Sequence, residues 1–224
     1  MRLSIIVPAL DEAAGIATTL AALQPLRARG HEVLVVDGGS RDATLVVARP
    51  LADRAFVAPR GRALQMNAGA AQATGDVLLF LHADSMLPPA ADDAIRAAIG
   101  GGAHWGRFDV RIAGRPWVLR LVAPAMNLRS RLTGIATGDQ GIFVDRAAFT
   151  RAGGFPEIPL MEDVALSRAL KRCAGRPACL RERIVTSGRR WETRGPWRTI
   201  LTMWRLRAAY ALGADPVHLA RRYR

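Results

Sequence analysis

The sequence predicts an α/β fold in which helices flank a mostly parallel sheet, with a smaller antiparallel portion in the second half of the chain. Short apolar runs alternate with helical patterns through the first half, and polar or glycine-bearing turns follow each run. The chain has 224 residues, 50% of them hydrophobic, which is enough to bury the core of such a sheet. We therefore expect a single domain over residues 1–224.

The expected elements follow from these patterns in chain order. Buried parallel strands are predicted at residues 3–7, 32–36, 54–57 and 76–81, where valine, leucine and isoleucine dominate. Helices are predicted between them at residues 12–26, 42–48, 62–73 and 90–99. Glycines 100–102 then form a break between residues 1–99 and 103–224. Beyond it we expect a more exposed, antiparallel strand at 105–112, a basic helix at 116–132, a strand at 141–144, a helix at 162–172 and a helical tail at 197–223.

The formal net charge of +13 is the strongest anomaly of composition, and it comes from arginine because Lys171 is the only lysine. Such a balance favours anionic partners: nucleic acid, an acidic membrane surface or a phosphorylated substrate. Arginine-rich solvated helix faces are the alternative explanation. Cys173 and Cys179 have no cluster of metal ligands beside them, so we expect free thiols.

No apolar run is long enough to cross a bilayer. The start MRLSIIVPALDE resembles a signal peptide, but Asp11 and Glu12 interrupt its apolar stretch. We therefore expect a cytoplasmic protein. The tail WRTILTMWRLRAAY, beginning at Trp197, fits either a packed amphipathic helix or a helix lying on the inner face of the membrane, and this choice stays open.

Polar side chains stand where the predicted parallel strands end, which is where ligands bind in open α/β sheets. The segment SIIVPALDE brings Pro8, Asp11 and Glu12 to the end of the first strand, and VVDGGSRDAT brings Asp37 to the end of the second. A carboxylate at that position can bind a base or a ribose. The alternative is structural: Asp11 and Glu12 suit any helix start, and Asp37 can cap a turn.

Two further segments carry groups for a diphosphate and a metal. RGRALQMNAGAAQATGD places Arg60, Arg62 and Gln65 around a helix start, where arginines and free N–H groups suit phosphates. LLFLHADS places His82 and Asp84 after a strand with one residue between them, so both could reach one divalent cation. A satisfied histidine beside a helix-capping aspartate is the structural alternative.

These segments together resemble the family 2 glycosyltransferases, which have the GT-A fold, a Rossmann-like parallel sheet. GRALQMNAGA, LLFLHAD, WGRFDV, GDQGIFV, GGFPEIPLMEDVALSRAL and SGRRW are similar to a bacterial subgroup named for its association with radical-SAM and selenium-related proteins. The resemblance covers nearly the whole chain. It implies a hexosyltransferase-like enzyme with a nucleotide-sugar donor and Mn²⁺ or Mg²⁺, a donor half at 1–99 and an acceptor half at 103–224.

The resemblance also implies roles for individual residues of the donor half. Pro8, Glu12 and Asp37 would line the nucleoside pocket, Arg60 and Gln65 would approach the diphosphate, and Asp84 would hold the metal. His82 replaces the first aspartate of the family's DxD motif, so a direct metal bond and a contact to the ribose are both open for it.

In the second half, adjacent Glu162 and Asp163 begin a helix, and the resemblance assigns Asp163 as catalytic base with Glu162 supporting it. Such a base contributes roughly 10²–10⁴-fold to rate, whereas two acids that only stabilise a helix start are the structural alternative. Contacts to the sugar or acceptor are expected as follows: Asp139 and Gln140 between glycines, and Trp105 by stacking. Phosphate contacts are expected from Arg189 and Arg190.

The function expected is an inverting single displacement in which the cation and arginines stabilise the leaving nucleoside diphosphate. A nucleotidyltransferase is the first alternative, but it needs a glycine-rich basic loop after the first strand, where PALDE stands. A basic module for RNA or an acidic membrane is the second, with nucleic acid the less favoured partner. A membrane-bound acceptor would reconcile membrane contact with sugar transfer.

Overall fold

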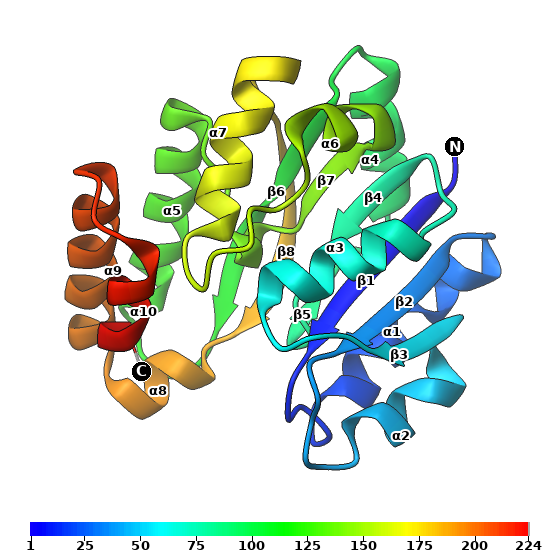
Figure 1. Cartoon of the computed structure of the whole chain (residues 1–224), viewed down its shortest axis with the longest axis horizontal. Helices are drawn as coiled ribbons and strands as arrows, with labels where there is room; N and C mark the ends of the chain where they lie inside the picture. Colours follow the sequence, from blue (N-terminus) through cyan, green and yellow to red (C-terminus); the bar gives the residue numbers. More distant parts are fainter. Residues whose placement is uncertain (224) are drawn as a thin grey trace.

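The computed structural model describes residues 1–223, apart from the side chains of Arg190, Arg222 and Tyr223. The described residues form one eight-stranded sheet with the order β3-β2-β1-β4-β7-β6-β8-β5, covered by helices on both faces (Figure 1). Its strands are β1 (Leu3–Ala9), β2 (Glu32–Asp37), β3 (Arg54–Val57), β4 (Val77–Phe80), β5 (Ser85–Met86), β6 (Trp105–Ala113), β7 (Ile142–Asp145) and β8 (Ala178–Ser187). The sheet runs through both halves of the chain, so the two halves share one sheet.

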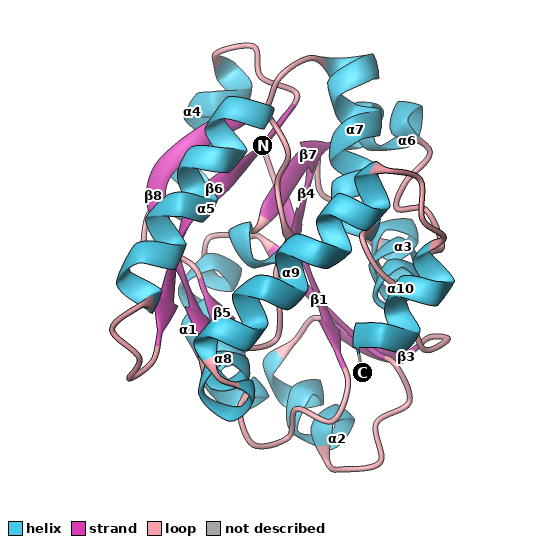
Figure 2. Cartoon of the chain, turned by 90° about the vertical axis from the view of Figure 1, so that its left-hand side faces the viewer, coloured by secondary structure: helices cyan, strands magenta, loops and turns pink. Residues whose placement is uncertain are grey.

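The helices connect these strands and then continue beyond the last one. They are α1 (Ile16–Ala28), α2 (Thr44–Ala48), α3 (Arg62–Gln72), α4 (Ala91–Gly100), α5 (Leu119–Thr133), α6 (Arg146–Ala152), α7 (Glu162–Ala174), α8 (Arg189–Arg194), α9 (Pro196–Ala211) and α10 (Pro216–Tyr223), with short 3₁₀ turns η1 (Arg49–Leu51) and η2 (Gly138–Gln140). Figure 2 shows α5, α8, α9 and α10 together on one side of the molecule. None of the described helices is long and apolar enough to cross a membrane.

The parallel strands β1, β2 and β4 are buried on both faces because helices cover each face, whereas the edge strand β3 is partly exposed. Strands β3, β2, β1 and β4 are parallel neighbours. Alternate residues of β1 face opposite ways: Ile5 packs into the core under α1, and Ile6 packs into the core under α3 and α7. The carboxyl ends of β1, β2 and β4 consequently open at one edge, as the apolar runs predict.

The second half differs from the expectation at β6. This strand is antiparallel to β7 but parallel to β8, and Trp105 and Phe108 are fully buried, so the prediction of a more exposed antiparallel strand is wrong in part. The neighbouring strand β8 was not predicted from the sequence. Without β8, the alternation of polar and apolar residues in β6 is typical of a strand at the edge of a sheet. Pairing with β8 and cover from α5 bury β6 instead.

Close packing of α3 against β1 depends on Gly69. A Cβ atom at this position would overlap Cγ2 of Ile6 and stand 3.1 Å from Cγ2 of Val36. We expect Gly69→Ala to lower the free energy of unfolding by about 1–3 kcal/mol, because overpacking outweighs the gain in helix propensity. Urea denaturation measures this change. Gly100→Ala is the control, since nothing lies within 4 Å of its added Cβ, and equal stability of the two variants would contradict the packing argument.

Candidate active site at the carboxyl ends of the strands

The loops after β1 and β2 are joined by hydrogen bonds between side chains and backbone. The Asp11 N–H donates to Ser40 Oγ over 2.9 Å, and the Asp11 carboxylate accepts from the Arg41 N–H over 2.8 Å. The Glu12 N–H donates to Thr44 Oγ1 over 2.8 Å. Asp42 accepts from the Thr44 N–H at the start of α2. These bonds form one ordered edge before any ligand binds.

Asp37 ends β2 at this edge and is 2% exposed. Its carboxylate accepts from the N–H groups of Gly39 and Ser40 over 3.1 and 2.9 Å, and from the Ser40 hydroxyl. The side chain therefore holds the turn after β2, as the structural alternative predicted. Pro8 is half-buried on β1, and Arg60 is exposed in the loop before α3. All three stand around the same strand ends, where the sequence placed the nucleoside and diphosphate.

The turn after β4 carries His82 and Asp84, which have different charged neighbours. Thr19 of α1 donates to the Ala83 carbonyl over 2.6 Å, and Ser187 of β8 donates to the Asp84 carbonyl over 3.2 Å, which fixes the turn. His82 Nδ1 lies 3.2 Å from an Asp139 oxygen, whereas the charge of Asp84 acts on Arg189. The described residues contain no group of three His, Cys, Asp or Glu side chains suited to a metal.

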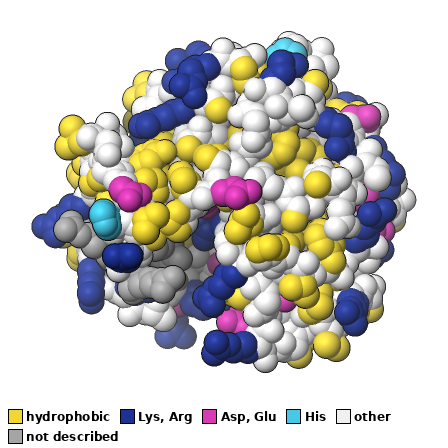
Figure 3. All heavy atoms as spheres, viewed as in Figure 1, with side chains coloured by type: hydrophobic (Ala, Val, Ile, Leu, Met, Phe, Trp, Pro, Cys, Tyr) yellow, Lys and Arg dark blue, Asp and Glu magenta, His cyan; other side chains and the backbone are white. Residues whose placement is uncertain are grey.

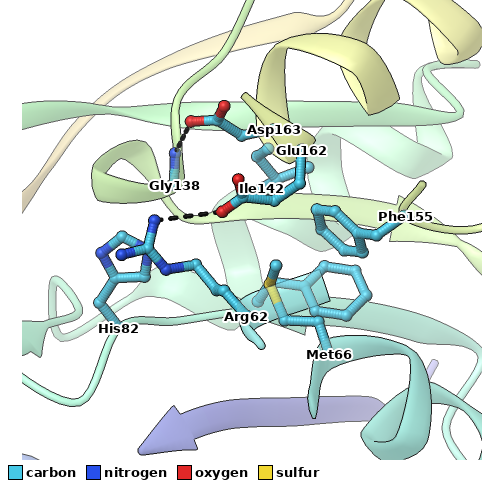
Figure 4. A pocket seen from close by; sticks show the side chains of 9 residues that line it. Arg62, Met66, His82, Gly138, Ile142, Phe155, Glu162 and Asp163 are labelled. Atoms are coloured by element: carbon cyan, nitrogen blue, oxygen red, sulfur yellow. Dashed lines mark hydrogen bonds and ion pairs between the residues drawn. The ribbon is translucent and has the colours of Figure 1, made fainter. Parts of the chain in front are cut away.

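A second cluster lies beside this turn, where α7 begins (Figure 4). Arg62 of α3 donates to Glu162 over 3.1 Å, and the backbone N–H of Gly138 donates to the Asp163 carboxylate over 2.9 Å. Met66 and Phe155 form an apolar wall beside them, and His82 faces the Arg62 guanidinium. The acidic pair of α7 therefore lies next to the turn after β4, although the two segments are far apart in the sequence.

Burial and the charge of Glu162 raise the pKa of Asp163 to about 6. Hydrogen bonds from Gly138 and Val164 and the charge of Arg62 oppose this shift. Burial lowers the pKa of Arg62, but the negative charges around it, chiefly Glu162 and Asp163, together have the larger, opposite effect. The pKa of Arg62 is therefore raised. A carboxyl group with a pKa near neutral can accept a proton during a reaction and return it to water.

Gly138 places two of these groups, since its N–H holds Asp163 and its Cα lies against the His82 ring. A Cβ atom here would overlap His82 Nε2, a ring atom that is already buried without a hydrogen-bond partner in the described structure. We expect Gly138→Ala to lower kcat by about tenfold to a hundredfold, because displacement of a positioned group is costly to catalysis. Steady-state kinetics measures this loss. Gly100→Ala adds a Cβ with nothing within 4 Å and is a control for folding.

Predicted binding residues from near the two ends of the chain meet at α8. Arg189 donates to both oxygens of Glu12, over 2.7 and 3.0 Å, and this pair links the loop after β1 to the C-terminal helices. Hydrogen bonding to Glu12 raises the pKa of Arg189, and the charge of Asp84 adds to the effect. Arg189 is therefore close to the predicted donor side. The side chain of Arg190 lies outside the described residues.

Three predicted ligand contacts are not met, because the side chains point into the protein. Gln65 is 4% exposed and donates to the carbonyls of Ala9 and Val36, bridging the ends of β1 and β2. Gln140 is fully buried, and its side chain caps η2 at Thr137. Trp105 is also fully buried and donates to the Gly175 carbonyl. Asp139, by contrast, has a side chain that is 45% exposed beside His82.

Sequence reasoning assigned no role to Gly138 or Arg129, and it expected Arg62 at a diphosphate. Arg62 lies in the predicted diphosphate segment but contacts Glu162 instead, and Gly138 is one of two glycines around Asp139. Arg129 of α5 is close enough to Asp163 for their charges to interact. The glycine before Asp139 was the one feature of the sequence that could have indicated these residues. Arg62 and Arg129 look like ordinary arginines of basic helices.

Comparison with known proteins agrees with this architecture. TarS 1–349 of S. aureus has a TM-score of 0.67 and 20% identity, covering 84% of this chain and 61% of that one. The mannosyltransferase PcManGT of Pyrobaculum calidifontis, in complex with GDP-Man and Mn²⁺, has a TM-score of 0.64 and 23% identity, covering 93% and 61%. Glucosyl-3-phosphoglycerate synthase of M. tuberculosis has a TM-score of 0.62 and 19% identity, covering 83% and 71%. These identities establish the GT-A fold alone, and the chain spans about three fifths of the first two structures.

No curated protein matches the sequence. The model described as glycosyl transferase family 2 matches residues 4–115, which is half of the chain and includes β1 to β4 with the loops that form the candidate site. The fold agrees with that match. The chain belongs to glycosyl transferase family 2.

Proposed function

We propose that this protein transfers a sugar from a nucleoside diphosphate sugar to an acceptor hydroxyl, with inversion at the anomeric carbon and Asp163 as the base. The observation that carries the proposal is the position of Asp163, a carboxyl group with a pKa of about 6 beside the turn that carries Asp84. The family match supports the reaction class. TarS has been solved with UDP-GlcNAc and PcManGT with GDP-Man and Mn²⁺, which supports a donor of this kind.

The donor would lie across the ends of β1, β2 and β4. Pro8, Glu12 and Asp37 are the nucleoside contacts in this proposal, and Arg60 approaches the diphosphate from the loop before α3. The pair between Glu12 and Arg189 brings a second arginine towards the same phosphates. Because the two loops are joined before binding, little ordering free energy is lost when the nucleotide docks.

A divalent cation fits Asp84. Within the described residues this carboxylate accepts no hydrogen bond, and its oxygens are the hard ligands that Mg²⁺ and Mn²⁺ prefer. One carboxylate is enough when diphosphate oxygens and water complete the ligand set. The ion would neutralise charge on the leaving diphosphate. In this proposal His82 pairs with Asp139 and contacts the sugar, because its ring lies against η2.

Asp163 would act on the acceptor. Its carboxylate takes the hydroxyl proton as the acceptor oxygen bonds to the anomeric carbon and the bond to the diphosphate oxygen breaks. Attack from the face opposite the leaving group inverts the configuration. Glu162 raises the pKa of this base, and Arg62 places a positive charge beside the two carboxylates Glu162 and Asp163. Asp139 is exposed beside them and is proposed to contact the sugar or acceptor.

Donor consumption without an added acceptor tests the proposal. The purified protein with Mn²⁺ is incubated with UDP- and GDP-sugars, and the UDP or GDP released by slow hydrolysis of the donor is followed by ³¹P NMR. We expect release from at least one donor, abolished in Asp163→Asn but not in Glu157→Gln, an exposed carboxylate in the loop before α7. Release of pyrophosphate from a nucleoside triphosphate instead would favour the nucleotidyltransferase alternative, which lacks the glycine-rich loop it needs after β1.

A peripheral membrane contact is a second proposal, and it rests on exposed apolar side chains. They form an apolar stripe along α9 and the α5 region: Trp197, Leu201, Trp204 and Leu212, with Trp117, Leu121, Leu128 and Leu132. Neither α5 nor α9 contains an acidic residue, and each carries arginines. Exposed tryptophans beside arginines suit an anionic lipid surface. Arginines are spread over the face seen in Figure 3 rather than gathered along one groove, which gives no support to nucleic acid as the partner.

We expect the paired change Trp197→Ser with Trp204→Ser to abolish co-sedimentation with vesicles that contain phosphatidylglycerol. Both side chains are more than half exposed, at 64% and 72%, so folding should be unaffected. Added salt should weaken vesicle binding of the unaltered protein, because it screens the attraction between the exposed arginines and the anionic lipid. Equal sedimentation of the variant and the unaltered protein would rule out the stripe as the contact.

A further inference from the structure

Arg129 is a half-buried cation of the acceptor half that the proposed mechanism does not use. It lies on α5, where Val122, Met126 and Arg129 follow the i, i+4, i+7 spacing of one helix face. Val122 and Met126 pack against the buried cluster of Val110, Ile112, Leu119 and Ala123, and so does Trp191 of α8. The Arg129 side chain lies on the same face of α5 as Val122 and Met126, and its charge reaches Asp163.

Two nitrogens of Arg129, Nε and Nη2, are buried and have no hydrogen-bond partner within the described structure. Arg107, a fully buried arginine nearby, is satisfied by Ser130, Asp109 and the Asn127 carbonyl. Burial lowers the pKa of Arg129, yet a guanidinium keeps its proton in proteins. Buried N–H donors without a partner are costly, so these two nitrogens have a reason other than folding stability.

The neighbours of Arg129 separate it from the donor side. Its charge interacts with Asp163 and Arg107, whereas Arg189 interacts with Glu12 and Asp84. The donor diphosphate thus has an arginine of its own at the strand ends. A second anion is expected on the other side of the base, where the acceptor must lie if Asp163 is to take its proton.

We propose that Arg129 binds an anionic group of the acceptor, a phosphate or a carboxylate, and so places the acceptor hydroxyl at Asp163. This inference rests on the proposed function for the identity of the base. The planar fork of a guanidinium offers two parallel N–H donors, which match the oxygens of either anion. The unpaired Nε and Nη2 atoms are the pair of donors on one edge of that fork. An acceptor without an anionic group leaves them unpaired.

Binding of phosphate probes tests this assignment without needing the natural acceptor. Inorganic phosphate and glycerol 3-phosphate are titrated by calorimetry into the unaltered protein, Arg129→Met and Arg96→Met, with glycerol as the neutral probe. Arg96 is exposed on α4 and serves as the matched loss of one positive charge. We expect Arg129→Met to weaken both phosphate probes by about tenfold or more and Arg96→Met to change them little.

Thermal unfolding of the same proteins guards against misfolding as the cause. Phosphate should raise the Tm of the unaltered protein and of Arg96→Met but not of Arg129→Met, because only a ligand bound to the folded state stabilises it. Without phosphate the Tm of Arg129→Met should equal or exceed that of the unaltered protein, since two buried N–H donors without a partner are removed. Vesicles that contain phosphatidic acid form the second arm. If Arg129→Met weakens binding to these vesicles but does not change binding of glycerol 3-phosphate, the phosphate belongs to a lipid.

Equal phosphate affinity in Arg129→Met and Arg96→Met would overturn the inference, as would the absence of phosphate binding to the unaltered protein in both arms. Titration of the same samples with UDP or GDP and Mn²⁺ separates this result from the proposed function. Nucleotide binding without an effect of Arg129 contradicts only the acceptor site. Phosphate binding that depends on Arg129, in a protein that binds no nucleotide, contradicts only the sugar transfer.

Discussion

Asp163→Asn is expected to lower kcat by roughly 10²–10⁴-fold while the affinity for the donor changes only a few-fold. The amide has the shape of the carboxylate but cannot accept the acceptor proton. Its oxygen can still accept from the Gly138 N–H, which holds the native group over 2.9 Å. Steady-state and single-turnover kinetics measure the loss, and Glu157→Gln is the control. Activity within threefold of the unaltered protein would remove Asp163 from the mechanism.

The pH dependence of kcat/KM gives an independent check on this base. Because burial and Glu162 raise the pKa of Asp163 to about 6, the rate should fall as pH drops below about 6, where the carboxylate is protonated. Glu162→Gln removes a negative neighbour and should move this limb to lower pH. Arg62→Met removes a positive neighbour and should move it to higher pH. Shifts of the same sign in both variants would contradict the assignment.

Asp84→Asn is expected to abolish the part of donor binding that depends on metal. Loss of groups that merely support a metal ligand costs about 10- to 100-fold in metal affinity, so loss of the ligand itself should cost at least that much. Free Mn²⁺ is measured by its electron paramagnetic resonance signal during titration with protein and UDP or GDP. Asp93→Asn, an exposed carboxylate on α4, is the control.

A change at His82 tests whether His82 and Asp84 have different roles. His82→Asn should leave Mn²⁺ affinity nearly unchanged and lower kcat instead, because the ring lies against Gly138 and Asp139. A loss of Mn²⁺ affinity in His82→Asn equal to that in Asp84→Asn would show that both residues hold the ion.

The parallel half of the fold could be predicted closely from the sequence. Strand β3 at Arg54–Val57 has the predicted bounds, and β2 at Glu32–Asp37 is longer by one residue. Strands buried on both faces are continuous apolar runs, and these are the clearest pattern that a sequence offers. The site edge followed from the same pattern, since the carboxyl ends of parallel strands meet.

Strand β8 could not be found in this way. Its centre, Arg181 to Arg183, is exposed and charged, and a bulge opposite Phe108 and Asp109 breaks its register with β6. The alternation that marks a strand is lost there. The strand is held by its buried C-terminal residues, such as Ile184, and by pairing along β6, and neither contact is visible in a local window.

The site shows the same limit for single side chains. Gln65 has an amide typical of ligand contacts, yet the ends of β1 and β2 use both its amide hydrogens. Arg129 looks like one more arginine of a basic helix, and only the fold shows that two of its nitrogens are buried without a partner. Side-chain roles depend on contacts between distant segments, so residue type and spacing predict the place of a site better than the work of each residue.

Calorimetric titration of the purified protein with UDP, GDP and their sugar conjugates, with and without Mn²⁺, tests the central claim most directly. We predict that at least one nucleotide binds, that Mn²⁺ strengthens its binding, and that the sugar conjugate competes for the same site. Absence of binding by every nucleotide, with and without Mn²⁺, would contradict the donor site at the ends of β1, β2 and β4.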